Sequence, residues 1–408
     1  MSQTTQSATI IILPTIQKRL LLDRPYDYIK DRAHLRDYVA QTQGTPILAI
    51  DTEFIREKTY WPNLCLIQLA TEEHTALVDP LLVDDLSPLQ ELFADQQTVK
   101  VFHSGDQDLE IIYQRLHMLP SPVFDTQLAA EILGMSQQVS LLVLVNDYCG
   151  VNLDKADSFT DWNVRPLSDS QISYAVDDVR YLPQIYKDMR ARLCAMDRLS
   201  WLEEDFREMC DESRYIVDPN QAWQRVKRSS TITGQRLGVL RELAFTRETI
   251  AMRRNLPRKW IATDELLIAI ARLCPLSIEE LHHLRGAQNQ LGHNWGMEII
   301  KAVKRGLALP SQQLPQRGGT AFKTASYAPS IDLMRTLLRW RAKQNHITQA
   351  MLANKEDLVK LAAGQRHGIK VLSGWRNKLV GQELLDLLDG KLSLHMDGGQ
   401  LVVTQRLC

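Results

Sequence analysis

Short apolar runs in the first half of the chain constrain its fold most strongly. Four runs with strand-like composition lie at residues 47–50, 64–70, 75–78 and 99–103. Helical patterns follow at about 106–117, 125–133, 140–149 and 168–193. Strands that cluster first and then alternate with helices are typical of a mixed α/β sheet domain. We therefore predict such a domain at residues 25–204, preceded by an extension at 1–24.

The second half of the chain shows only helical patterns, so no strand is expected after about residue 200. We predict a helical domain at 205–309, a linker rich in Pro, Gly, Ser and Gln at 310–330, and a second helical domain at 331–408. Residues 295–306 resemble residues 379–390. The two segments lie farther apart in the chain than the repeats of a solenoid, so their similarity indicates a repeated domain.

The composition is that of a folded globular chain, with 44% hydrophobic and 24% charged residues. It excludes a disordered or collagen-like chain. No apolar stretch approaches the ~18 residues of a membrane span. The apolar run at 10–13 has its basic residues after it, unlike a signal peptide. The six cysteines form no CxxC pair, which is typical of reduced thiols. We expect a cytoplasmic protein without membrane association.

The net charge of −1 hides a division along the chain. Residues 1–220 carry a net charge of −16, and residues 221–345 carry +13. Surface charge can simply differ between domains. Alternatively, the acidic half collects cations while the basic middle region binds a polyanion. Composition alone does not decide between these two interpretations.

Two acidic residues, Asp51 and Glu53, follow the apolar run 47–50. Side chains alternate along a strand, so both carboxylates point to the same side. Like charges on one face repel each other unless a cation lies between them. Hard divalent cations such as Mg²⁺ prefer oxygen ligands of this kind. Taken alone, an Asp-x-Glu pair is more often a solvated strand end.

A helix predicted at Asp169–Arg192, with Ser168 as its N-cap, carries a further acidic pair. Its apolar stripe places Asp177 on the opposite side, in solvent, and Asp178 at the border of the stripe. Tyr174 lies one turn before Asp178 on the same face. The helix geometry therefore favours Asp178 as the functional carboxylate. A surface Tyr–Asp pair is the alternative.

A third acidic segment, HSGDQD at 103–108, joins a predicted strand to a predicted helix. Either Asp106 or Asp108 could be functional there. Asp106 is the better candidate for merely complementing the dipole of the helix N-terminus. Periodicity alone does not decide between these two residues.

The three acidic segments together resemble the exonuclease motifs of the DEDD nucleases: DTEF at 51–54, HSGDQD at 103–108 and YAVDD at 174–178. Tyr174 resembles the tyrosine of the DEDDy branch. Longer stretches at 51–70, 125–134 and 153–186 are similar to the ribonuclease D family. The helical blocks resemble HRDC domains, which that family carries in tandem. The resemblance implies an α/β ribonuclease H-like exonuclease domain, a mixed sheet flanked by helices, followed by two small all-α HRDC domains.

The resemblance also implies a catalytic site. The family spacing selects Asp108 over Asp106. Two divalent metal ions, Mg²⁺ or Mn²⁺, would be held by four carboxylates: Asp51 bridging both ions, Glu53 and Asp178 completing one, and Asp108 holding the other. Tyr174 would stay protonated and orient the attacking water. The expected activity is metal-dependent 3′–5′ trimming of tRNA precursors and other structured RNAs, releasing 5′-mononucleotides. We expect the protein to act as a monomer.

Five residues are candidates for substrate binding, each with a structural alternative: Phe54, His103, Arg254, Lys259 and Trp260. Phe54 would stack on a terminal base or pack in the core, and His103 would touch substrate or cap a loop. Basic residues beside Trp260 suit single-strand binding, unless that ring anchors the core. The same question applies to Trp375 and Arg376.

Two other functions remain open at this stage. The same metal site would also cut DNA, and only use of the ribose 2′-OH would distinguish the two activities. A nucleic-acid-binding adaptor without catalysis would be favoured by loss of one carboxylate, and all four are present.

Overall fold

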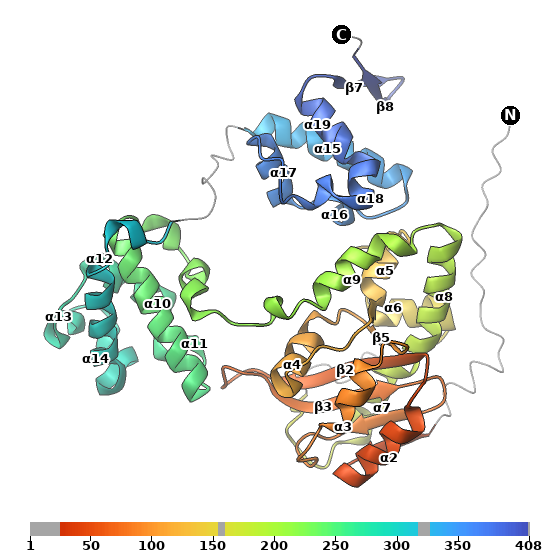
Figure 1. Cartoon of the computed structure of the whole chain (residues 1–408), viewed down its shortest axis with the longest axis horizontal. Helices are drawn as coiled ribbons and strands as arrows, with labels where there is room; N and C mark the ends of the chain where they lie inside the picture. Colours follow the sequence, from red (N-terminus) through yellow and green to blue (C-terminus); the bar gives the residue numbers. More distant parts are fainter. Residues whose placement is uncertain (1–24, 154–159, 317–326, 407–408) are drawn as a thin grey trace. The chain divides into compact units, whose positions relative to one another are not determined.

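The computed structural model describes residues 25–153, 160–316 and 327–406 (Figure 1). The predicted extension at 1–24 lies outside the described residues, as does most of the predicted linker, residues 317–326. The described residues form two compact units. Among the described residues, one unit contains 25–53, 65–153, 160–214 and 327–406, and the other contains 54–64 and 215–316.

A six-stranded mixed sheet forms the centre of the first unit (Figure 1). Its strands are β1 (Tyr26–Ile29), β2 (Ile47–Ile55), β3 (Asn63–Ala70), β4 (Thr75–Val78), β5 (Val99–Phe102) and β6 (Val123–Asp125). They lie in the order β1-β4-β3-β2-β5-β6. β1 pairs with β4, β2 with β5, and β5 with β6, all in parallel, whereas β3 and β4 are antiparallel.

Four of these strands confirm the sequence prediction, and the central β2 is buried over its whole apolar run. A strand covered on both faces has this continuous apolar composition. The short strands β1 and β6 were not predicted. β1 interrupts its apolar residues with Asp27, and β6 has only three residues, so the pairing with a neighbouring strand defines each of them.

Helices of the first unit pack around the sheet. They are α2 (Arg32–Thr42), α3 (Pro88–Ala94), α4 (Asp106–Leu116), α5 (Thr126–Ile132), α6 (Leu141–Leu144), α7 (Asp169–Arg180), α8 (Leu182–Ala195) and α9 (Glu203–Met209). A π-helical turn at Val145–Cys149 continues α6. α7 contacts β4, and α8 contacts β5.

The helix predicted at 169–192 is in fact two helices, so that prediction was wrong in its extent. α7 ends at Arg180, and α8 begins at Leu182 with Pro183 in its first turn. Proline lacks the N–H that would continue the helical hydrogen bonds and clashes with the preceding turn. The N-cap prediction is confirmed, because Ser168 and Gln171 form a capping box.

The second unit is helical: α10 (Gln235–Arg254), α11 (Arg258–Ile261), α12 (Asp264–Leu273), α13 (Ile278–His282) and α14 (Ala287–Leu307). The two long helices, α10 and α14, pack against each other around a leucine- and isoleucine-rich core. Short helices close the ends of this core.

The segment Phe54–Leu64, which connects β2 to β3, belongs to this second unit. Asn255, after the last residue of α10, accepts hydrogen bonds from the backbone N–H groups of Tyr60 (3.1 Å) and Trp61 (3.0 Å). The Tyr60 hydroxyl donates to the buried carboxylate of Glu248, and the Arg258 guanidinium lies over the Tyr60 ring. The connection between two central strands is thus part of the core of the helical unit.

The second helical block contains α15 (Ala328–Gln344), α16 (Gln349–Leu352), α17 (Lys355–Ala362), α18 (Gly374–Arg376) and α19 (Gln382–Leu388). It ends in a hairpin of β7 (Leu392–Asp397) and β8 (Gln400–Gln405). The expectation of no strand after about residue 200 was therefore wrong. Gly398 and Gly399 at the turn both have positive φ, which a two-residue hairpin loop requires.

This second block packs within the first unit. The Trp375 ring stacks on Trp201 with centroids 4.4 Å apart, and its Nε1 donates to the Trp201 carbonyl at 2.8 Å. Arg376 is only 2% exposed and forms a 2.8 Å ion pair with Asp205. Trp375 and Arg376 therefore serve an internal contact, which favours the structural alternative for both.

We predict that Asp205→Ala lowers the stability of the protein by about 3 kcal/mol, because it leaves the buried Arg376 guanidinium without its main charge partner. The unfolding midpoint in urea measures this loss. Asp389→Ala is the control. Its pair with Lys391 is about half exposed, so the change should cost under about 0.5 kcal/mol. Equal losses in the two variants would contradict this account of the contact.

Candidate active site

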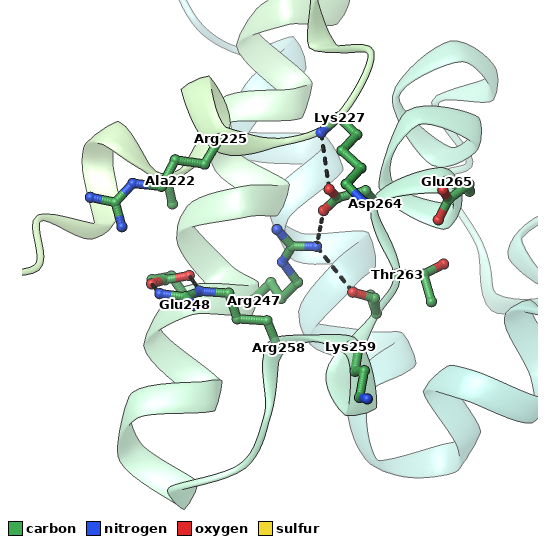
Figure 2. Close-up of a pocket in the computed structure, with 11 residues that line it drawn as sticks. Ala222, Arg225, Lys227, Arg247, Glu248, Arg258, Lys259, Thr263, Asp264 and Glu265 are labelled. Carbon is green, nitrogen blue, oxygen red and sulfur yellow. Dashed lines mark hydrogen bonds and ion pairs between the residues drawn. The ribbon is translucent and has the colours of Figure 1, made fainter. Parts of the chain in front are cut away.

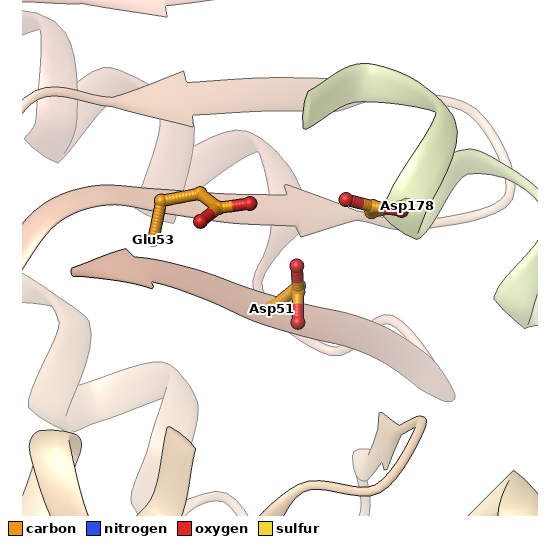
Figure 3. Close-up of side chains that lie close together, drawn as sticks. All are labelled: Asp51, Glu53 and Asp178. Atoms are coloured by element: carbon orange, nitrogen blue, oxygen red, sulfur yellow. The ribbon is translucent and has the colours of Figure 1, made fainter. Parts of the chain in front are cut away.

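Three carboxylates predicted from the sequence lie together in the first unit. Asp51 and Glu53 extend from the same face of β2, and Asp178 comes from α7 (Figure 3). One oxygen from each lies within 4.8 Å of the others. Residues more than a hundred positions apart in the chain thus form one cluster of oxygen ligands.

Burial makes the negative charge of this cluster costly. It raises the pKa of Asp51 well above its usual value, that of Glu53 to about 8 and that of Asp178 to about 7. The neighbouring carboxylates raise these pKa values further. Bound cations would relieve both the burial and the repulsion. The donor set, carboxylate oxygens alone, fits hard divalent cations such as Mg²⁺ or Mn²⁺.

The fourth carboxylate, Asp108, lies beside this cluster rather than within the trio. Its side chain is buried, and its Oδ1 accepts a 2.5 Å hydrogen bond from Thr52 Oγ1. Burial raises the pKa of Asp108 to about 6, and its charge contributes to the raised pKa values of Asp51 and Glu53. Thr52 was not among the predicted residues, since only the fold shows that it meets Asp108.

A tight turn places Asp108. A Cβ on Gly105 would lie 2.6 Å from the Phe102 Cβ, so only glycine fits there. The Gly105 N–H donates to the buried Asp125 carboxylate at 2.8 Å, and Asp125 also caps α5. As a result, Asp108 faces the interior, whereas Asp106 is exposed and pairs with Arg214 at 3.1 Å. The fold thus favours Asp108 over Asp106 as the fourth carboxylate of the site, a choice that periodicity alone did not make.

Tyr174 lies beside the carboxylate cluster. Its hydroxyl is hydrogen-bonded to Asp178, and its ring centroid lies 6.1 Å from that of the buried Trp162. Burial and the surrounding carboxylates raise the pKa of Tyr174 far above its ordinary value of 10. The phenol therefore stays protonated near neutral pH, as expected.

The prediction that Asp177 lies in solvent was wrong. Its side chain is only 28% exposed and lies 3.5 Å from the Arg180 guanidinium. Val176 is buried as well, so α7 packs over a wider arc than its apolar stripe indicated. Asp177 still lies outside the trio of carboxylates.

Two candidate substrate-binding residues belong to the sheet region: Phe54 on β2 and His103 directly after β5. Phe54 follows Glu53 on β2 and is partly buried. The His103 Nδ1 lies 2.9 Å from the Thr126 hydroxyl, which itself donates to the Phe102 carbonyl, so we assign the proton to Nδ1. Burial lowers the pKa of His103 to about 4, so the ring is neutral. These contacts favour a structural role for His103, and substrate contact by either residue stays a prediction.

The other three candidates lie in the second unit. Arg254 ends α10, and Lys259 and Trp260 lie on α11. Trp260 is 48% exposed, which argues against the alternative of a core anchor. Arg254 and Lys259 are exposed as well. Their contact with nucleic acid stays a prediction.

Sequence and structure comparisons agree with this organisation. Residues 26–194 match the 3′–5′ exonuclease family, and residues 236–303 match the HRDC domain. The molecule is thus a 3′–5′ exonuclease domain followed by an HRDC domain. An HRDC identity for the second helical block stays a prediction. No helix in the described ranges is both long and apolar enough to cross a membrane.

Individual relatives identify the family. Ribonuclease D of Sphingobium indicum is 39% identical over 388 residues, covering 92% of this chain and 98% of that protein. Ribonuclease D of Zymomonas mobilis is 37% identical over 380 residues, covering 92% and 97%. The crystal structure of Escherichia coli RNase D matches with a TM-score of 0.81 at 30% identity, over 90% of this chain and 99% of that one. The chain belongs to the ribonuclease D family and is a 3′–5′ exoribonuclease.

We predict that Glu53→Gln stabilises the metal-free protein at about pH 8 but not near pH 5. The folded state raises the pKa of Glu53 from 4.5 to about 8, so its charge penalty is absent at low pH and grows as pH rises through that range. Melting curves in EDTA should show a gain of a few degrees at the higher pH only.

The control for this prediction is Glu57→Gln, which makes the same chemical change at an exposed position and should have little effect at either pH. With Mg²⁺ present the advantage of Glu53→Gln should vanish, because the variant has lost a ligand for the cation. A gain independent of pH would show that the repulsion among the carboxylates is not its cause.

Proposed function

We propose that the carboxylate cluster holds two divalent ions and removes nucleotides from the 3′ ends of tRNA precursors and other structured RNAs. The supporting observation is the half-buried trio of Asp51, Glu53 and Asp178, with oxygens within 4.8 Å of one another. The solved RNase D of Escherichia coli is described as an exoribonuclease involved in structured RNA processing, which supports this substrate class. The preference for tRNA rests on the family resemblance.

The residues of the chain have distinct proposed roles. Bound Mg²⁺ or Mn²⁺ would supply Lewis-acid stabilisation of the reacting phosphate and a more acidic water. Asp51, Glu53 and Asp178 would hold these cations, with Asp108 as the fourth carboxylate. Tyr174 keeps its proton, so its hydroxyl can hold the attacking water next to Asp178. Hydrolysis would release 5′-mononucleotides.

RNA binding by the second unit is part of this proposal. Residues 1–220 carry a net charge of −16 and would repel an RNA backbone, whereas residues 221–320, which lie in the second unit, carry 16 Lys and Arg against 7 Asp and Glu. The basic region would therefore supply the long-range attraction for the substrate. A monomeric state and a cytoplasmic location also remain proposals.

We expect Asp51→Asn or Asp178→Asn to lower the rate of hydrolysis by at least about 10²-fold, because each removes a ligand of the cations. RNA binding should be retained. Single-turnover cleavage of 3′-extended tRNA and of matched single-stranded DNA, with and without Mg²⁺ or Mn²⁺, measures this loss and tests RNA preference.

Asp106→Asn is the matched control, since Asp106 is exposed and paired with Arg214. It should cleave at nearly the wild-type rate. Full activity of either Asp51→Asn or Asp178→Asn would overturn the assignment of the cluster. Faster cleavage of DNA than of RNA would instead favour a DNA exonuclease.

For Tyr174→Phe we predict a loss of roughly 10²-fold in kcat with little change in KM, because only the water-positioning hydroxyl is removed. Single-turnover rates at saturating RNA measure the chemical step. A rate equal to that of the wild type would show that Tyr174 only packs against the helix and Trp162.

A further inference from the structure

A pocket of about 380 Å³ lies in the second unit (Figure 2). Its residues are separate from the carboxylate cluster of the first unit. It is bounded by residues 222–227, by α10 and α11, and by the beginning of α12. Five of its lining side chains are cationic: Arg225, Lys227, Arg247, Arg258 and Lys259. Three are acidic: Glu248, Asp264 and Glu265.

Arg247 is the buried charge of this pocket. Its side chain is 5% exposed, and its Nη1 donates to Asp264 Oδ1 at 2.7 Å and to the Ala262 carbonyl at 3.1 Å. Its Nε is buried and has no hydrogen-bond partner among the described residues. Figure 2 shows the guanidinium group with Asp264 on one side only. A buried donor without an acceptor is costly, so this side chain is incompletely satisfied by the protein.

The acidic residues of the lining are largely committed to other partners. Glu248 accepts two hydrogen bonds from Arg258, at 2.6 and 2.7 Å, as well as the Tyr60 hydroxyl. Asp264 binds Arg247 through one oxygen and the Lys227 backbone N–H through the other, at 2.9 Å.

Three exposed cations of the lining take no part in these pairs: Arg225, Lys227 and Lys259. No side-chain ion pair within the described part of the chain neutralises them. Only Glu265 is left to balance these three charges, so the pocket carries an excess of positive charge. A small anion is the ligand that this arrangement fits.

We infer that this pocket binds one phosphate group of the backbone of single-stranded RNA. A phosphate oxygen would accept from Arg247, while Lys227 and Lys259 would neutralise the charge. Trp260, next to Lys259 in the chain, offers an exposed ring on which a neighbouring base can stack. The volume exceeds that of a phosphate alone and leaves room for the attached ribose. This inference rests on the proposed RNA-processing function.

The test compares two pairs of substitutions in the full-length chain. Lys227→Gln with Lys259→Gln removes two pocket cations and leaves the buried Arg247 in place. Arg236→Gln with Lys304→Gln is the matched control, since both residues are exposed in the same unit and do not line the pocket. All chains carry Asp51→Asn to suppress cleavage, and melting curves check that each one folds.

Binding of a short single-stranded RNA is measured by fluorescence anisotropy over a range of salt concentrations. The pocket pair should weaken binding by about tenfold and reduce the slope of log K against log[salt] by ~0.7, the value for one phosphate contact. The control pair should change affinity by less than about twofold. A single neutral methylphosphonate is then placed at each position of the RNA in turn. At one position it should weaken binding by the chain with an intact pocket but not binding by the pocket pair.

Equal losses in the two pairs, with no such position, would overturn the inference and indicate general charge attraction only. Competition separates the possible sources of the phosphate. If inorganic phosphate or AMP occupies the pocket while RNA binding is unaffected, the site serves a free phosphate and the inference is wrong. The proposed function is tested separately, by cleavage of 3′-extended tRNA with the chain that keeps Asp51. A failure to cleave would count against the proposed function, whatever the pocket binds.

Discussion

Repulsion among half-buried carboxylates is the constraint on which the exonuclease domain depends. Asp51 and Glu53 share one face of β2, and α7 brings Asp178 against them. Burial and mutual charge raise their pKa values, so the folded chain opposes its own ionised state near neutral pH. Packing of the sheet and the helix must therefore offset this repulsion. Bound cations would reduce it.

Several residues that carry no chemistry keep the site in place. Gly105 allows the turn before α4, Asp125 fixes that turn, and Thr52 holds the buried carboxylate of Asp108. The strand β2 also continues into Phe54–Leu64, a segment that belongs to the helical second unit. Through the Tyr60–Glu248–Arg258 contacts, that unit anchors the connection that follows β2. The strand that carries Asp51 and Glu53 therefore runs directly into the helical unit.

The division of charge along the chain now has a physical interpretation. The acidic residues of the exonuclease domain include the cluster that fits divalent cations, so part of the negative charge suits metal binding. Part of the positive charge in the second unit is structural, since Arg258 and Arg247 pair with Glu248 and Asp264. The exposed remainder, together with Trp260, is available for an anionic substrate. Binding of a polyanion by these exposed residues stays a prediction.

The sequence alone determined the type of fold, the main strands and the acidic residues that come together in the structure, because apolar periodicity and acidic motifs are local features of the chain. It did not show that the helix at 169–192 breaks at Pro183, how deeply Asp177 is buried, or that a hairpin ends the chain at 392–405. It also left the role of the Trp375–Arg376 pair open. Only the tertiary structure decided these points, because burial and pairing depend on neighbours that are distant in sequence.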